Sequence, residues 1–310
     1  MRPALSVLLL TTLLGAAQGL FLALYAGELA VRVGAAAGAS ARFLAVGGGV
    51  VLALAGLGLV ASVFHLGRPE RGWRAAARWR TSWLSREVVA LPLFMAGVFA
   101  WSLAQFAAPP ATIVVGAVTA AVCVTLFVCT GMIYASLRVL QEWATPLTPV
   151  NILLLGCASG TTLAAGYAAL QVSPLAAPYA RAAIGLTFVG AITRLASLRR
   201  NRSLRPRTTL QSALGIAHPR IRQTAQGLMG GSFNTREFFH GATPAKMTAV
   251  RRGFVVGAFA LPLALLCLPG ASPAVLITAF LVQYLGLLAE RWYFFAEANH
   301  PQNLYYQVIS

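Results

Sequence analysis

The chain has 310 residues, of which 58% are apolar and only 10% are charged, and its mean hydropathy is +0.73. A soluble domain carries roughly 25% charged residues, so this composition excludes an ordinary globular enzyme. The 24 basic residues outnumber seven acidic ones and give a net charge of +17. In a soluble protein this charge would indicate nucleic-acid binding. In a membrane protein, arginine-rich loops instead mark the cytoplasmic face and contact anionic lipid, and no nucleic-acid partner is expected.

Eight apolar stretches predict an all-α polytopic membrane protein with about eight transmembrane helices, forming one integral membrane domain over 1–310. Because an α-helix rises 1.5 Å per residue, about 20 apolar residues cross the hydrocarbon core. The last three stretches are short and can span if the flanking Arg194, Arg252 and Arg291 extend to the interface. The first stretch is expected to be a retained helix, not a signal peptide. The stretches cover approximately 4–25, 43–64, 88–106, 112–137, 150–170, 182–198, 253–268 and 274–288.

The basic residues are distributed unevenly between the two sides of the predicted bundle. An even number of helices places both termini on one side, and that side holds all but three of the 24 basic residues. The exceptions are Arg32, Arg42 and Arg181. The positive-inside rule therefore predicts a bacterial cytoplasmic (inner) membrane protein with both termini in the cytoplasm.

Two enlarged basic loops, 65–87 and 198–252, are expected on the cytoplasmic side, where partners would dock. Loops of this length on a compact membrane domain are usually functional. The stretch 71–80 in the first loop combines arginines with Trp73 and Trp79. This composition predicts an amphipathic helix on the membrane surface.

Neither the cysteines nor the histidines form a pattern that binds a metal. All four cysteines lie inside apolar stretches without a C-x-x-C pair, so we interpret them as buried, inert thiols. A membrane b-type haem needs axial ligands inside facing helices. The four histidines, His65, His218, His240 and His300, all lie outside the predicted helices. We therefore expect no metal, haem or iron–sulfur cluster in this chain.

The end of the second stretch carries the sharpest local motif, Phe64-His65-Leu66-Gly67-Arg68-Pro69. Gly67 and Pro69 stop a helix, which places His65 at a helix C-terminus at the membrane boundary, where it can cap the last carbonyls. Glu87 begins the next stretch, so a helical hairpin brings it to the same depth as His65. The carboxylate can pair with Arg86 or another loop arginine. Alternatively, His65 and Glu87 can hydrogen-bond and protonate a quinone carbonyl.

Two further observations concern acidic residues. Glu290 and Arg291 end the last stretch on the same side and, being adjacent, are expected to face different directions. They can brace the loops, which we favour, or Glu290 can join a proton path. The interiors of the predicted helices carry no acid and no clear inverted repeat, which argues against a transporter. A solitary membrane carrier or scaffold whose basic loops bind lipid is the rival of another class.

Four segments of the chain resemble the dimethyl sulfoxide reductase anchor-subunit family, and the resemblance extends over essentially the whole chain. It implies a membrane anchor that holds an iron–sulfur subunit and a molybdopterin catalytic subunit. The anchor then exchanges electrons between the iron–sulfur subunit and a quinone, ubiquinone or menaquinone, without a metal of its own. The family's quinone-site histidine and glutamate match His65 and Glu87, with Arg68 as their neighbour. The segments are Phe-His-Leu-Gly-Arg-Pro-Glu at 64–70, Thr-Ser-Trp-Leu-Ser-Arg-Glu at 81–87, Trp-Ala-Thr-Pro-Leu-Thr-Pro at 143–149 and Ala-Glu-Arg-Trp-Tyr-Phe-Phe at 289–295.

One branch of the family is particularly similar. Segments 230–240 and 296–306 resemble anchors of cytoplasm-facing, sulfite-oxidising complexes, in which electrons flow from sulfite to quinone. Because the partner's substrate sets the direction of flow, the alternative is a quinol-oxidising anchor of a dimethyl sulfoxide-type reductase.

Overall fold

The computed structural model describes residues 1–64, 67–225 and 237–306, and their regular elements are all helical. Eight of these helices are long and apolar enough to cross a membrane, which confirms the predicted fold class. The spans are α1 (Leu5–Arg32), α2 (Ala41–Val63), α3 (Trp83–Ala107), η2 with α4 (Pro109–Ala135), α5 (Leu147–Leu170), α6 (Ala176–Arg202), α9 with η3 and α10 (Pro244–Leu266), and α11 (Pro273–Glu297).

The seventh span is a composite of three elements. α9 (Pro244–Val255) continues through the π-turn η3 (Val256–Ala260) into α10 (Leu261–Leu266). The remaining elements lie at the ends of the bundle. They are η1 (Pro69–Arg78), η2 (Pro109–Ala111), which precedes α4 (Thr112–Ala135), α7 (Leu210–Leu214) and η4 (Pro301–Leu304).

Most spans extend beyond the apolar stretches that predicted them. α1 continues to Arg32 and α6 to Arg202, so both helices include charged residues. Arg194 was expected to extend to the interface, but it lies inside α6 with its side chain only 3% exposed. The expectation was wrong because an acidic residue on another helix pairs with this guanidinium inside the bundle. Hydropathy alone would not place a charged side chain there.

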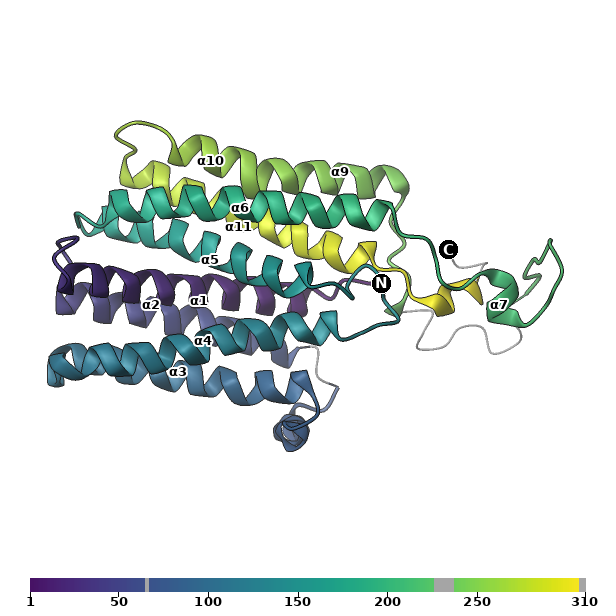
Figure 1. Cartoon of the computed structure of the whole chain (residues 1–310), viewed down its shortest axis with the longest axis horizontal. Helices are drawn as coiled ribbons and strands as arrows, with labels where there is room; N and C mark the ends of the chain where they lie inside the picture. Colours follow the sequence, from purple (N-terminus) through teal and green to yellow (C-terminus); the bar gives the residue numbers. More distant parts are fainter. Residues whose placement is uncertain (65–66, 226–236, 307–310) are drawn as a thin grey trace.

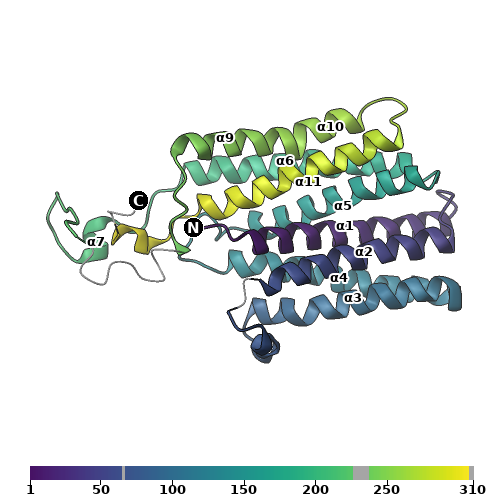
Figure 2. The same cartoon turned by 180° about the vertical axis from the view of Figure 1, so that it is seen from behind.

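The spanning helices run side by side along the long axis of the molecule, and both termini lie at the same end (Figure 1). The reverse view shows α7 and the two termini beyond that same end of the bundle (Figure 2). The N-terminal amino group donates a hydrogen bond to the carbonyl of Ala298 at 2.9 Å, which ties the two ends of the chain together. We call this end of the bundle the basic end, because the long basic loops leave from it.

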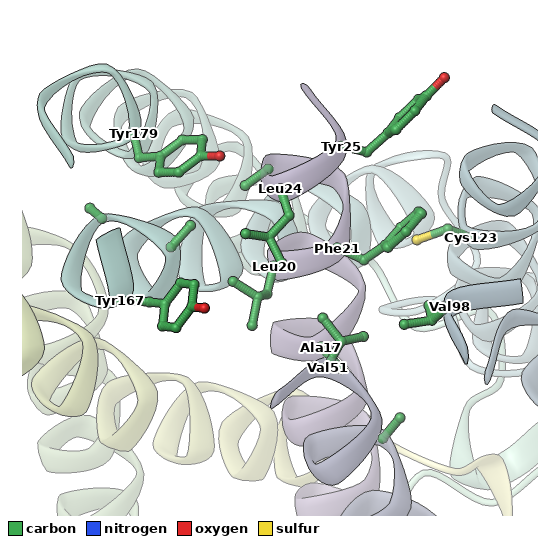
Figure 3. Close-up of a cluster of buried hydrophobic side chains, with 14 of the residues drawn as sticks. Ala17, Leu20, Phe21, Leu24, Tyr25, Val51, Val98, Cys123, Tyr167 and Tyr179 are labelled. Atoms are coloured by element: carbon green, nitrogen blue, oxygen red, sulfur yellow. The ribbon is translucent and has the colours of Figure 1, made fainter. Parts of the chain in front are cut away.

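α1 lies at the centre of the bundle and packs against α2, α4, α5 and α11. Its side chains Leu20, Phe21 and Leu24 lie between Tyr167 and Tyr179 on one side and Val98 and Cys123 on the other (Figure 3). Phe21 also meets the rings of Phe94 and Trp101 edge-on, at centroid distances of 5.7 and 5.4 Å. The central helix therefore joins the α2–α4 half of the bundle to the half formed by α5, α6 and α9–α11.

Glycines set the close contact between α1 and α5. Gly15 and Gly19 on α1 and Gly156 and Gly160 on α5 each form a G-x-x-x-G pair, and the two pairs face one another. A Cβ on Gly19 would overlap the carbonyl of Gly156, and one on Gly160 would overlap the backbone of Gly19 and Leu20. Helices inside a bilayer gain little from apolar burial, so close backbone approach through small residues is a main source of helix association.

We expect Gly160→Ala to destabilise the bundle, because the added methyl group meets backbone atoms that cannot move independently. Overpacking of this kind costs roughly 1–3 kcal/mol. The matched control is Gly49→Ala on α2, where a Cβ would meet open space and where alanine gains about 1 kcal/mol of helix propensity. Thermal unfolding in detergent should therefore shift down for Gly160→Ala and stay level or shift up for Gly49→Ala. Equal shifts would show that this contact is not close-packed.

Candidate functional site

The structure describes two of the three predicted site residues. Glu87 lies in the second turn of α3 at the basic end, and Arg68 is exposed at the start of η1. His65 lies outside the described residues. α2 ends at Val63, before the predicted Gly67–Pro69 stop, and α3 begins at Trp83 at the same end of the bundle.

The carboxylate of Glu87 lies between α3 and α4 with one hydrogen-bond donor. The hydroxyl of Thr130 on α4 donates to its Oε1. No cation within the described segments lies close enough to Glu87 to form an ion pair. The salt bridge to Arg86 considered above does not form, because that guanidinium donates instead to the carbonyls of Trp79 at 2.9 Å and Arg80 at 2.8 Å. Glu87 is thus a carboxylate in a membrane helix with most of its acceptor capacity unused.

A groove of about 510 Å³ runs along the outer side of the α3–α4 seam, lined by Arg86 and Ala90 on either side of Glu87 in the chain but not by Glu87 itself. Its floor is almost entirely apolar, and it includes Cys129, the neighbour of Thr130. Its mouth at the basic end carries Trp79, Trp83 and Arg86, and the Arg86 guanidinium stacks 4.2 Å from the Trp83 ring centroid. The groove suits a long apolar molecule whose polar end lies at the membrane boundary.

Most of the segment predicted to form a helix at 71–80 lies in the 3-10 helix η1, at the mouth of this groove. Its dark-blue coil is seen end-on in Figure 1, so its axis crosses the bundle axis and runs along the membrane plane when the bundle spans. Trp73 within it and Trp79 at its C-terminal end are 72% and 54% exposed, which is high for tryptophan. Arg74 and Arg80 lie over these two rings at 5.5 and 5.3 Å.

A family model described as DMSO reductase anchor subunit (DmsC) matches residues 1–289. The chain belongs to the DMSO reductase anchor subunit family. A sulfite dehydrogenase subunit of Allochromatium vinosum is 50% identical to it over 326 aligned residues, covering 100% of both chains. These matches confirm the resemblance predicted from the sequence motifs. Of the motif at 230–240, residues 230–236 lie outside the described residues.

At the basic end, the anchor carries a pocket of about 620 Å³ between the α4–α5 connection, the α6–α7 connection and the C-terminal segment. Arg138 and Arg207 line one part of it, and Glu142, Asn201 and His300 line another. The amide of Asn299 donates to Glu142 at 3.2 Å. Burial, assisted by the charge of the N-terminal amino group, lowers the pKa of His300, which favours its neutral imidazole.

Sequence reasoning missed a buried carboxylate at the opposite end of the anchor. Glu28 on α1 is only 3% exposed, although the predicted helix interiors contained no acid. It accepts hydrogen bonds from Trp101 Nε1 at 2.8 Å, Gln105 Nε2 at 3.4 Å and the hydroxyl of Thr112, and it pairs with Arg32 at 3.2 Å. The apolar stretch was ended at residue 25, so Glu28 was counted as loop. The Glu28–Arg32 spacing of one helical turn was the available signal.

A second ionic cluster lies inside the basic end, between α6 and α11. Glu290 Oε1 lies 2.6 Å from Arg194 Nε, and its Oε2 lies 3.4 Å from Arg291 Nε. The prediction that Glu290 and Arg291 face different directions was wrong, since the long Arg291 side chain folds back onto its neighbour. All three side chains are 7% exposed or less.

The cysteines are less uniform than predicted. Cys123 and Cys129 are buried and Cys157 is partly buried, but Cys267 is exposed at the end of α10. The apolar stretch that contains Cys267 faces outward there, which hydropathy alone does not reveal. Within the described segments, no three His, Cys, Asp or Glu side chains come together as a metal site.

Proposed function

We propose that this anchor is the quinone-reactive membrane subunit of a three-subunit oxidoreductase. In this proposal an iron–sulfur subunit and a molybdopterin catalytic subunit dock on its cytoplasmic side, and electrons pass from sulfite oxidation to the quinone pool. Glu87 carries the proposal, because it is a carboxylate inside a membrane helix with one donor and no cationic partner among the described residues.

The residues around Glu87 fit a quinone. Quinone reduction takes up two electrons and two protons, so a carboxylate next to the ring can pass a proton to a carbonyl oxygen. The apolar groove along α3 and α4 can hold an isoprenoid tail, and its aromatic mouth at the basic end suits a ring at the interface. His65 follows the end of α2 by two residues, and we assign it the second hydrogen bond to the quinone. Arg68 is its basic neighbour.

The basic end supports the proposed docking side. Its pocket and loops offer arginines, including Arg138 and Arg207, to acidic surfaces of a partner. By the positive-inside rule this end faces the cytoplasm of a bacterial inner membrane. The name of the Allochromatium vinosum relative, a sulfite dehydrogenase subunit, supports sulfite as the electron source. The family is described by its DMSO reductase members, so an anchor that oxidises quinol is the alternative.

Purification of the tagged anchor from its native membrane in mild detergent tests the assembly. We expect molybdenum, iron and two further chains to arrive with it, and sulfite to reduce the complex. Reduction by quinol together with turnover of a sulfoxide would favour the alternative direction. A metal-free, solitary chain under gentle extraction would contradict the anchor role and favour a carrier or scaffold.

Glu87→Gln is expected to lower quinone-linked turnover of the purified complex by roughly 100-fold or more, because the amide cannot exchange a proton. Activity with an artificial dye should stay intact, since the dye takes electrons from the partner subunits. His65→Ala should behave in the same way, and Thr130→Val should give a smaller loss. The matched control is Glu70→Gln, an exposed glutamate on η1 paired only with Arg71 at 3.8 Å. Normal quinone turnover in Glu87→Gln would refute the site.

Reporter fusions test the sidedness of the bundle. A reporter that is active only in the cytoplasm should work when it is fused after Ser310, and a periplasmic reporter should not. A fusion in the 267–272 connection, at the opposite end of α11, should give the reverse pattern. A periplasmic signal at Ser310 would overturn the orientation and with it the proposed docking side.

A further inference from the structure

α6 and α11 carry a ladder of polar side chains that extends from the basic end to the middle of the bundle. Three residues on α6 each meet one on α11, and each pair joins residues that are 96 apart in the chain. Within each helix the three are spaced seven residues apart, so the two helices run in the same direction with one constant register. The pairs are Thr187 with Gln283, Arg194 with Glu290, and Asn201 with Glu297.

The middle rung of this ladder is costly for a membrane protein. Arg194 and Glu290 are 3% and 1% exposed, and the desolvation of two such charges can exceed their attraction. A register-setting role would explain one polar pair. It does not explain the buried polar atoms next to this rung, because Asn151 Oδ1 and Arg194 Nη2 find no hydrogen-bond partner in the part of the chain that the structure describes.

Both of these residues line a small cavity of about 10 Å³. That volume is about the space that one water molecule needs, and a polar wall is the condition for a water to be held there. Glu142 lines this cavity and also lines the large pocket at the basic end. The cavity therefore continues the polar surface of that pocket down to the carboxylate of Glu290.

Tyr134 on α4 has two relevant neighbours: Thr130, the donor to Glu87, and Phe294, a residue of the cavity wall. It is one helical turn from Thr130, which donates to Glu87, so the two side chains share a face of α4. Its ring meets Phe294 edge-on at 5.4 Å, and Phe294 lines the cavity with the Arg291 guanidinium 5.4 Å from its ring centroid.

We propose that these groups form the proton-uptake route of the anchor, from the basic-end pocket through the Glu290 cavity and Tyr134 to Glu87. This inference rests on the proposed quinone function of Glu87. Protons enter from water in the pocket and pass over Glu290 and a cavity water. The Tyr134 hydroxyl then gives its proton to Glu87 as it receives another from the cavity side. Only protons move along this route, and the electrons come from the partner subunits.

Four charged side chains contact the Glu290 carboxylate or lie close to it. Arg194 on α6 and Arg291 on α11 lie 2.6 and 3.4 Å from its oxygens, and Glu297 lies one rung nearer the surface, with its Oε2 4.0 Å from Arg194 Nη1. Glu142 lines the same cavity. The proposed route is therefore lined by charged groups from the pocket to the cavity.

The test uses the purified complex with a soluble ubiquinone analogue, in H₂O and in D₂O. Glu290→Gln and Tyr134→Phe should each lower quinone-linked turnover about tenfold and raise the solvent isotope effect, with dye-linked activity unchanged. Tyr134→Phe keeps the ring and its packing, so it tests the hydroxyl alone. Glu290→Asp, which keeps an acid, should retain more turnover than Glu290→Gln.

Glu28→Gln is the matched control, because Glu28 is an equally buried, arginine-paired carboxylate at the opposite end of the anchor. It should leave the quinone-linked rate and isotope effect unchanged in the assembled complex. Loss of turnover in Glu87→Gln but not in Glu290→Gln or Tyr134→Phe would overturn the route and leave the proposed function intact. If Glu290→Gln and Glu28→Gln lost equal quinone-linked turnover and neither raised the solvent isotope effect, the ladder would have only a structural role. Normal turnover in Glu87→Gln would refute the quinone site itself.

Discussion

The contact between α1 and α5 is the constraint on which the rest of the bundle depends. Gly15, Gly19, Gly156 and Gly160 allow the two backbones to touch, and no larger side chain fits at the tightest points. Inside a bilayer, such packing replaces the apolar driving force that holds soluble domains together. The α2–α4 unit builds outward from one side of this pair, and α6 with α9–α11 builds outward from the other. Each side holds one group of polar residues at the basic end, and the close-packed pair fixes how far apart these groups lie.

Three of the buried or partly buried carboxylates, Glu28, Glu290 and Glu87, differ in how their oxygens are satisfied, and this difference separates their roles. Glu28 accepts from Trp101, Gln105 and Thr112 and pairs with an arginine, so its oxygens are occupied and it fastens α1 to α3 and α4. Glu290 is held by two guanidinium groups but lies against a cavity. Glu87 has one hydroxyl donor, which leaves acceptor capacity for water or a ligand. Of these three, the carboxylate with the most acceptor capacity left is therefore the one at the basic end of α3, where we propose that a proton and a ligand both arrive.

Much of the architecture could be predicted from the sequence, because hydropathy and charge act locally. Apolar runs near 20 residues gave eight spans, and the surface helix at 71–80 could be identified from its tryptophans and arginines. The predictions that failed concern side chains whose partners are distant in sequence. Arg194 was assigned to the interface because its partner Glu290 lies 96 residues later in the chain, and an apolar stretch of about 20 residues does not include it. Glu28 was missed because the predicted stretch was ended at residue 25, three positions before it. In the folded bundle the carboxylate of Glu28 is paired with Arg32, so the helix can continue past it. Only part of the candidate site could be predicted. Glu87 was proposed from its depth and stays a prediction, and its donor Thr130 comes from another helix and carries no signal of its own.

The constant offset between α6 and α11 shows how such distant pairs can be recognised in principle. A seven-residue repeat of polar positions, Thr187, Arg194 and Asn201, is present in the first helix, and the same repeat recurs in Gln283, Glu290 and Glu297. Neither repeat means much alone, since a polar stripe on a helix is usually a solvated face. In a chain this apolar, however, a polar stripe that continues to the middle of a span cannot be solvated by lipid and needs a partner of matching period. Two stripes of equal spacing therefore predict that their helices run in the same direction and pair, as α6 and α11 do. Water or a proton can follow such a stripe only where its atoms are left unpaired, and among the described residues such atoms occur at the rung of Arg194 and Glu290 and at Gln283 in the rung above it.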